Sequence, residues 1–437
     1  MKKIKLYKIE RNLLLAAFAL VGFGHHIAGV SLPLEYSTFL IFVVLILQII
    51  SGTFKFPKFL FYVLAFIILQ TFILNPSNLS DPRVISHFTG LTLLALSTFS
   101  FVSYYRDKLY DFVISYYKLV YYIALFSLFQ IGIFLLTGFS LIPQNLITGT
   151  TIAMGSNVFV PAFLGILPRN IGLSTEPANF AYILIPAVYI GLSQLLQKNS
   201  FIKLPKQFVW VILTSTVLTF SLVAYFGILL SVTFILKEHF LRNIKNVIVS
   251  IFLVSALIYG IFASGVGNKF IALTNMGKEI SENRLETHSY TSFAIISNLT
   301  VAIKSQKENH FIGSGLNTHI NNYDKYIYQI FKKKQVLLEL NKNAAGSVFI
   351  RVLSEFGIFG LITFLMLLIH YRINKRGNSA RFKELNEMAL VTILLYCTRS
   401  GHYTGITFLM FIAIYYFTYQ MNNTPGNKAE NLEIQKT

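Results

Sequence analysis

The sequence predicts an all-α polytopic membrane protein with about 12 transmembrane helices and one large extracytoplasmic loop of partly helical structure. Of the 437 residues, 54% are hydrophobic and only 13% are charged, about half the charged share of a soluble domain. The mean hydropathy is +0.60. Apolar runs long enough to cross a bilayer recur along the chain, and the single cysteine excludes an intrachain disulfide.

The predicted spans are taken in chain order. They lie at 12–30, 34–54, 58–74, 85–105, 112–138, 177–197, 207–221, 224–237, 246–263, 348–371, 385–399 and 403–420. The seventh and eighth are short and nearly continuous, so a broken or re-entrant helix near Tyr225 is the alternative. The basic start at 1–11 resembles a signal peptide, but no small-residue cleavage site follows the first apolar run. We therefore expect a retained first helix and a single integral membrane domain over 1–437.

The distribution of basic residues predicts the orientation of this domain. Lysine and arginine total 37 against 18 acidic residues, which gives a net charge of +19. With a cytoplasmic N-terminus, 22 of the 37 fall in cytoplasmic segments, including the tail 421–437, and three (Arg83, Arg169 and Arg399) fall in short outer loops. Because cytoplasmic loops are enriched in lysine and arginine, both termini are expected inside. The segments 139–176 and 264–347 are then extracytoplasmic loops, and the basicity requires the lipid bilayer but no nucleic acid as a partner.

The sequence lacks the patterns of metal and nucleotide chemistry. It has four aspartates, no Asp-x-Asp pair and no His-Glu-x-x-His. A Walker loop, a dinucleotide fingerprint and a Gly-x-Ser-x-Gly elbow are also missing from the sequence. We therefore expect chemistry on the outer face that needs neither a metal ion nor a cofactor.

Two short outer segments carry charged residues at helix ends. In the first, Glu176 precedes Pro177 at the start of a predicted span, and Arg169 lies seven residues before Glu176. The carboxylate either complements the helix dipole or acts together with the arginine. In the second, the turn 399–403 carries Arg399, His402 and Tyr403. Arginine on this side is costly near hydrocarbon, so it indicates an anionic partner, with an interfacial Arg–Tyr anchor as the alternative.

Two further segments contain candidate residues. Arg351 and Glu355 are four residues apart at the start of a predicted span, where they can form an ion pair, and Arg351 could also reach a phosphate. Gly357 and Gly360 on the same helix predict a small-residue packing face. The long loop contains the Gly-x-Gly element 313–315, and its stretches 281–305 and 320–342 are predicted to be helical, the first of them amphipathic.

These segments together resemble the O-antigen polymerase and O-antigen ligase superfamily of membrane glycosyltransferases. The resemblance rests on Arg169 upstream of Gly-Leu-Ser-Thr-Glu-Pro at 172–177, on Gly-Ser-Gly-Leu at 313–316 in a large late loop, and on Leu-Ser-Glu-Phe-Gly-Ile-Phe-Gly at 353–360. A weaker match is Leu-Thr-Phe-Ser at 218–221. The resemblance in topology extends over nearly the whole chain, whereas the motifs cover about 50 residues. Each motif is weak alone, and the case rests on their order along the chain and on the side of the membrane where they are expected.

The resemblance implies an extracytoplasmic transfer in the bacterial inner (cytoplasmic) membrane from a polyprenyl-diphosphate-linked oligosaccharide donor to an acceptor sugar. The diphosphate leaving group requires fixed positive charge, because arginine binds phosphate oxygens bidentately and stays protonated. The candidates for this role are Arg169, Arg399, Arg351 and Arg284. A chain-length regulator and a flippase of the same pathway are the implied protein partners.

The acceptor hydroxyl must lose a proton, and Glu176 or His402 is the candidate general base. Tyr403, Gly313 and Gly315 complete the expected site. Ligase members carry a His-Asn pair just before the helix that starts near Ser347, where this chain has Gly346 and Ser347.

This departure favours a repeat-unit polymerase that makes O-antigen, capsule or exopolysaccharide. The alternatives are a ligase that transfers finished glycan to a lipid or protein, and a lipid-linked oligosaccharide flippase.

Overall fold

The computed structural model describes a helical bundle over residues 2–21, 36–138, 161–163, 167–174, 176–196, 200–237, 290–309, 311–330, 341–374, 380–401 and 403–424. Its α-helices are α1 (Lys2–Leu20), α2 (Tyr36–Ile50), α3 (Lys58–Ile68), α4 (Pro82–Tyr104), α5 (Leu109–Thr137), α7 (Pro177–Leu196), α8 (Lys206–Val217), α9 (Leu222–Leu236), α12 (Tyr290–Glu308), α13 (His319–Ile330), α14 (Val348–His370), α15 (Ala380–Arg399) and α16 (Ile406–Asn423). Short elements are the π-turn η1 (Leu69–Ile73), the 3-10 turns η2 (Pro76–Ser80) and η3 (Arg106–Lys108), and the antiparallel strands β1 (Pro161–Phe163) and β2 (Leu167–Pro168).

Within the described residues, four helices are long and apolar enough to cross a membrane: Pro82–Tyr104, Arg106–Thr137, Pro177–Leu196 and Val348–His370. Shorter apolar helices occupy Tyr36–Ile50, Lys58–Ile73 and Leu222–Leu236. The expected helical, membrane-protein character is therefore present. The count of 12 spans and the sidedness of the bundle stay predictions.

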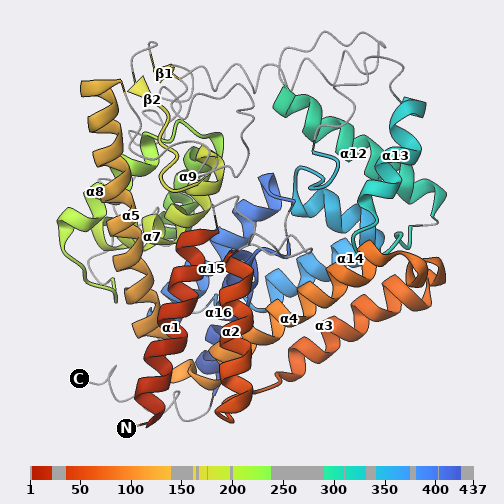
Figure 1. Ribbon diagram of the computed structural model, residues 1–437, viewed down its shortest axis with the longest axis horizontal. Helices are drawn as coiled ribbons and strands as arrows, with labels where there is room; N and C mark the ends of the chain where they lie inside the picture. Colours follow the sequence, from red (N-terminus) through yellow and green to blue (C-terminus); the bar gives the residue numbers. More distant parts are fainter. Residues whose placement is uncertain are drawn as a thin grey trace.

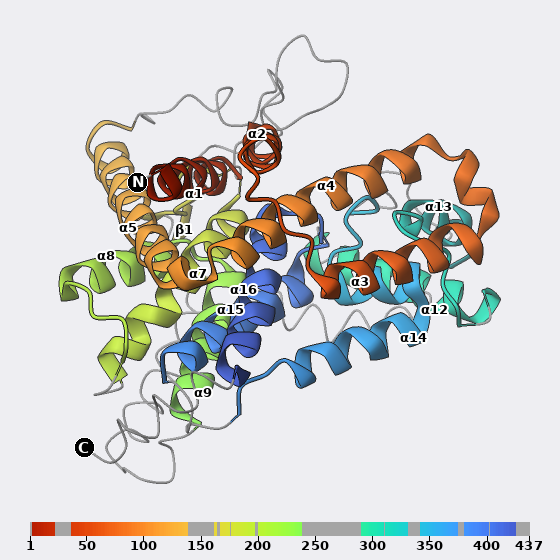
Figure 2. The ribbon, with the colours of Figure 1, turned by 90° about the horizontal axis from the view of Figure 1, so that it is seen from below.

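The helices α7, α15 and α16 form the centre of the bundle. Their side chains contribute a large share of the main apolar core, and α15 packs against both α16 and α7. Viewed from below, α1, α5 and α8 lie on one side of this centre, while α3, α4 and α14 extend to the other with α12 and α13 beside them (Figure 2). The strands β1 and β2 lie at the end of the molecule opposite the N-terminus (Figure 1).

Connecting segments gather at two separate ends of the bundle. At the end that holds the N-terminus, the Tyr7 hydroxyl donates to Asp111 at 2.9 Å, and the Phe201 amide donates to Glu384 at 2.9 Å. At the other end, Arg83 donates to Asn321 at 3.0 Å. The 23 residues of α4 join these ends, a rise of about 35 Å at 1.5 Å per residue.

Several predicted boundaries change. The first helix begins at Lys2, ten residues before the predicted span, because the basic start continues the helical turn. The predicted seventh and eighth spans are α8 and α9, and the interruption lies at 218–221, just before Tyr225. The predicted helical stretches of the long loop, 281–305 and 320–342, overlap α12 and α13. The predicted span 246–263 lies outside the described residues.

Candidate functional site

The helix α14 is interrupted at Gly357, where the backbone has φ 72° and ψ −174°. The loop before α13 fills this interruption, which we call the α14 break. The Gly315 amide donates to the Glu355 carbonyl at 2.7 Å, and the Ile358 amide donates to the Phe311 carbonyl at 3.2 Å. Non-helical backbone inside an apolar helix is tolerated only where its polar groups find partners, and the loop supplies them. The prediction of Gly357 as part of a packing face is therefore wrong: this glycine breaks the helix.

The glycines of the Gly-x-Gly element are required by close backbone contact. Gly313 has φ +90°, and a Cβ there would lie 2.5 Å from the Gly357 nitrogen. Gly315 has φ +102°, and a Cβ there would lie 2.4 Å from the Asn78 side-chain nitrogen. Both conformations favour glycine, and neither position leaves room for a side chain. The predicted site residues Gly313 and Gly315 thus hold the loop against the α14 break.

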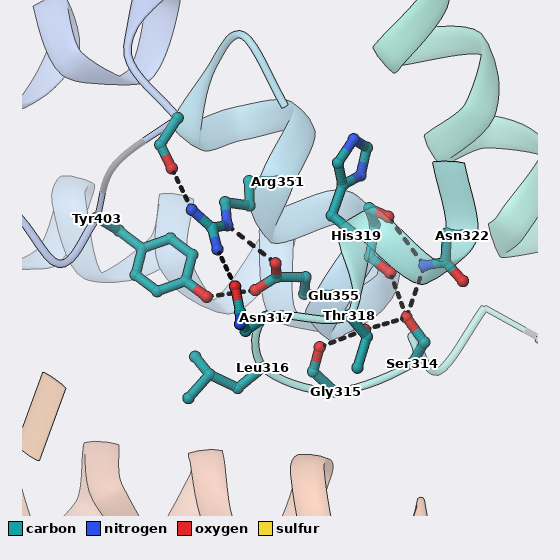
Figure 3. Close-up of polar contacts among 12 residues, drawn as sticks. Ser314, Gly315, Leu316, Asn317, Thr318, His319, Asn322, Arg351, Glu355 and Tyr403 are labelled. Atoms are coloured by element: carbon teal, nitrogen blue, oxygen red, sulfur yellow. Dashed lines mark hydrogen bonds and ion pairs between the residues drawn. The ribbon is translucent and has the colours of Figure 1, made fainter. Parts of the chain in front are cut away.

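Each of the three nitrogens of the Arg351 guanidinium, next to this break, donates a hydrogen bond (Figure 3). Its Nε donates to Glu355 at 2.9 Å, its Nη1 to the Gly401 carbonyl at 2.9 Å, and its Nη2 to Asn317 Oδ1 at 2.7 Å. The Tyr403 hydroxyl donates to the second Glu355 oxygen, and the guanidinium lies 4.5 Å from the centroid of the Tyr403 ring. The predicted Arg351–Glu355 ion pair is confirmed, and it is buried. Arg351 therefore fastens the turn 399–403 to α14.

His319 lies beside this network at the start of α13, fully buried. The Asn298 amide nitrogen donates to the Ala294 carbonyl, so Asn298 Oδ1 is an acceptor and His319 Nε2 is the donor across their 2.8 Å contact. The other nitrogen, Nδ1, has no partner among the described residues. Burial, together with the nearby positive charge of Arg351, lowers the pKa of His319 to about 3. The imidazole is therefore neutral at physiological pH.

A second interruption separates α8 from α9 at residues 218–221; we call it the α8–α9 turn. Phe220 within it has φ 44°, a conformation uncommon for a bulky residue. The segment after β2 docks onto it: the Asn170 amide donates to the Leu218 carbonyl at 2.8 Å, and Arg169 Nη2 donates to the Phe220 carbonyl at 3.0 Å. The Asn170 side chain also donates to the Ser215 carbonyl at 3.0 Å. Both interrupted helices are thus closed by a loop that docks onto their backbone.

Arg169 at the α8–α9 turn has spare hydrogen-bonding capacity. Its Nε is buried and has no partner among the described residues. Burial lowers the pKa of Arg169, while the nearby Glu176 carboxylate and Tyr225 raise it. The guanidinium stays charged because the intrinsic pKa of arginine is so high. The predicted pair of Arg169 and Glu176 therefore lies within electrostatic range, and Glu176 is exposed.

Arg399 is the last residue of α15. Its Nη1 is buried without a partner in the described part of the chain. The hydroxyl of Tyr182, on α7, lies within electrostatic range of both Arg399 and Glu176, and it too has no partner among the described residues. The Ser174 hydroxyl, just before α7, is a third buried group in this state. Glu176 thus lies within electrostatic range of Arg169, and Tyr182 within range of Glu176 and Arg399. We call Arg169, Ser174, Glu176, Tyr182 and Arg399 the arginine cluster.

The predicted site residues consequently form two groups. Arg169, Glu176 and Arg399 belong to the arginine cluster, whereas Arg351, Tyr403, Gly313 and Gly315 belong to the α14 break. The turn 399–403 connects the two groups, because Arg351 binds the Gly401 carbonyl. Arg284 and His402 lie outside the described residues. Among the residues that are described, no group of three His, Cys, Asp or Glu side chains is placed to hold a metal ion.

The sequence did not single out Asn170, Asn317 or Tyr182. Asn170 directly follows the predicted Arg169, so its position beside a candidate residue was an available indication. Asn317 follows the Gly-x-Gly-Leu element in the same way. Tyr182 had no such indication, because one tyrosine among 24 on an apolar helix resembles a packing residue.

An apolar cavity of ≈ 140 Å³ lies between α3, α4, α14 and α16. Its walls include Ile67, Leu91, Phe364 and Leu409. Leu91 lies one helical turn from His87, whose ring is 5.8 Å from that of Tyr403. The cavity therefore lies along α14 beyond the α14 break, with Phe364 and Leu368 among its walls.

Comparison with protein-family models, with curated proteins and with solved structures finds no match to this chain. Relatives therefore assign it no family and no activity.

Proposed function

We propose that this protein is a membrane glycosyltransferase of the polysaccharide-polymerase type. It joins polyprenyl-diphosphate-linked repeat units on the extracytoplasmic face of the bacterial inner membrane. The observation that carries the proposal is the arginine cluster, where buried donors on Arg169 and Arg399 lack partners among the described residues. Buried polar groups are rarely left unpaired, and guanidinium donors without partners favour an anion such as a diphosphate.

The proposed reaction needs little from the protein beyond charge and orientation. The acceptor hydroxyl oxygen attacks the anomeric carbon of the donor, the bond from that carbon to the phosphate oxygen breaks, and the diphosphate leaves with the electron pair. Arg169 and Arg399 stabilise the charge that develops on the leaving group. In this proposal Glu176, which is exposed and within electrostatic range of Arg169, accepts the proton of the hydroxyl.

The other features of the structure support a lipid-linked substrate. The four helices that are long and apolar enough to cross a bilayer support a protein that meets its substrate in a membrane. In this proposal Arg351 acts as a positioning residue that holds the turn 399–403 and with it the end of α15. A flippase is the second candidate, because interrupted helices occur in transporters. Both interruptions here are closed by loops, which favours a fixed site.

The test is complementation of a deletion strain, read as a polysaccharide ladder on a gel. Arg169→Gln, Arg399→Gln and Glu176→Gln are compared with Arg83→Gln, an arginine at the same end that is already paired with Asp81 at 3.0 Å. The first two variants are expected to lower polymer formation by about 100-fold or more, the usual effect of losing one preorganised donor to a developing charge. Arg83→Gln is expected to retain the wild-type ladder.

The intermediate that accumulates distinguishes the alternatives. A single capped repeat unit supports the polymerase, whereas finished polymer on its lipid carrier identifies a ligase. Unprocessed lipid-linked repeat on the cytoplasmic face identifies a flippase. With purified protein and lipid-linked repeat units, polymer formation is expected to continue in EDTA; strong inhibition by the chelator contradicts the metal-independent mechanism.

A further inference from the structure

Arg381 lies at the end of the bundle that holds the N-terminus. It has aromatic neighbours and forms no ion pair among the described residues. Its guanidinium carbon lies 4.3 Å from the centroid of the Tyr110 ring and 5.7 Å from that of Phe201. The Tyr110 hydroxyl donates to the Phe201 carbonyl at 3.0 Å, which fixes the two rings relative to each other. The Arg381 Nε is buried and unpartnered in the described structure. We call Tyr110, Phe201 and Arg381 the Arg381 cradle.

The nearest carboxylate is used elsewhere. Glu384 Oε1 accepts from the Ser200 hydroxyl at 2.9 Å, and Oε2 accepts from the Phe201 amide at 2.9 Å. These bonds fasten the loop between α7 and α8 to α15. The Arg381 cradle consequently presents a cation whose hydrogen-bonding capacity is only partly used, a state that favours an external anion.

Exposed lysines lie on the segments that carry the cradle residues. Lys203 is exposed on the loop that carries Phe201, and Lys206 is exposed at the start of α8. Lys118 is exposed on α5, two turns beyond Tyr110 and inside a helix long and apolar enough to span a membrane. A lysine in such a position extends its side chain to bring the ammonium group to the phosphate layer.

Two exposed aromatic side chains lie on the cradle and on the helix that follows it. Phe201 is 48% exposed, and Trp210, one turn into α8, is 59% exposed. The helices α5 and α8 pack side by side (Figures 1 and 2). Aromatic rings beside basic side chains at helix ends are typical of the membrane interface, where one surface contacts hydrocarbon and the other contacts phosphate.

We infer that the Arg381 cradle binds the phosphate of an anionic phospholipid in the leaflet that meets the basic connecting segments. The guanidinium of Arg381 holds the phosphate oxygens, Lys118 and Lys206 add attraction, and the exposed face of Phe201 contacts the start of the acyl chains. This site is separate from the arginine cluster, at the other end of the bundle, and does not depend on the proposed reaction.

The test is native mass spectrometry of the full-length protein released from nanodiscs of phosphatidylcholine with or without phosphatidylglycerol. The wild type is expected to retain phosphatidylglycerol. Arg381→Gln is expected to lower the retained fraction by about fivefold or more, the contribution of roughly one basic side chain at an anionic surface. The matched control is Arg106→Gln, which removes the same charge from an exposed position at the same end.

The outcomes separate a built site from diffuse attraction. The cradle is supported if the retained phosphatidylglycerol falls in Arg381→Gln and stays within about twofold of wild type in Arg106→Gln. Equal losses in the two variants overturn it in favour of general surface charge. Displacement of the lipid by inorganic phosphate alone overturns the assignment to a phospholipid. If Arg381→Gln does not fold, Arg381→Lys and Lys118→Gln carry the same comparison, and unchanged retention in both rejects the proposal.

Discussion

The α8–α9 turn and the α14 break share one backbone arrangement but differ in how far the nearby arginine is hydrogen-bonded. In each, a loop from one end of the bundle supplies partners to the backbone of an interrupted helix. At the α14 break, the three guanidinium nitrogens of Arg351 are all bonded. At the α8–α9 turn, Arg169 has one backbone contact and an unpartnered Nε in the described structure. The first arrangement holds the fold together, and the second leaves capacity for a ligand.

The largest expected difference is in stability, between Arg351 at the α14 break and Arg399 of the arginine cluster. Arg351→Gln leaves the Glu355 carboxylate buried without its ion pair, so we expect a loss of about 3–5 kcal/mol in the free energy of unfolding. Arg399→Gln removes no bond made within the described residues and is expected to cost less than about 0.5 kcal/mol. Unfolding of the detergent-solubilised variants measures both. Equal losses would show that Arg399 is also structural and would weaken the proposed diphosphate site.

The next effect concerns the backbone of the α14 break. A Cβ at Gly357 would lie 2.2 Å from the Phe311 carbonyl oxygen, at a positive φ. We expect Gly357→Ala to cost about 2–4 kcal/mol, through strain and through displacement of the docked loop. The control is Gly132→Ala on α5, where a Cβ meets nothing within 4 Å. That substitution is expected to be neutral or to stabilise by up to about 1 kcal/mol. A mild effect at Gly357 would contradict the docked loop.

The same regions show which features of the fold can be predicted from the sequence. The Arg351–Glu355 pair follows from a spacing of four on one helix, and the start of α7 at Pro177 follows from local preference. An interruption near Tyr225 was one of the alternatives, because two short apolar runs met there. Local patterns of this kind are visible without knowledge of the fold.

The docking of the loops was not predictable in the same way. Gly357 beside Gly360 resembles a packing face, and only the arrival of Phe311 from a distant segment shows that Gly357 breaks the helix. The bond from Tyr403 to Glu355 joins residues 48 positions apart. Such pairings depend on how α14, α15 and the loop before α13 meet in space, and no periodicity in the sequence encodes that arrangement.

The α8–α9 turn has its own anchor in Asn170. Its side-chain nitrogen contacts the Ser127 hydroxyl and the Ser215 carbonyl, and its oxygen accepts from the Gly172 amide at 3.1 Å. We expect Asn170→Ala to cost about 1–3 kcal/mol, because buried partners lose their bonds. Asn12→Ala, at an exposed asparagine, is the control and is expected to stay within about 0.5 kcal/mol of wild type. If both variants unfold alike, the docking of the loop contributes little to the stability of this region.

The smallest expected effect is on how the free energy of unfolding depends on pH. Only the α14 break, through His319, should show it. The folded-state pKa of His319, about 3, lies below its ordinary value of 6.5, so the unfolded chain binds the proton more readily. The contribution to stability is therefore fully present above pH 6.5 and is lost as the pH falls. Linkage predicts a loss of about 1.4 kcal/mol for each unit below 6.5. Unfolding of the wild type and of His319→Gln at pH 7.5 and 5.5 isolates this contribution, because the other titrating groups are common to both proteins. A parallel pH dependence in the two proteins would show that His319 is accessible to protons in the folded state, and the α14 break would then resemble the α8–α9 turn as a place where a ligand can reach.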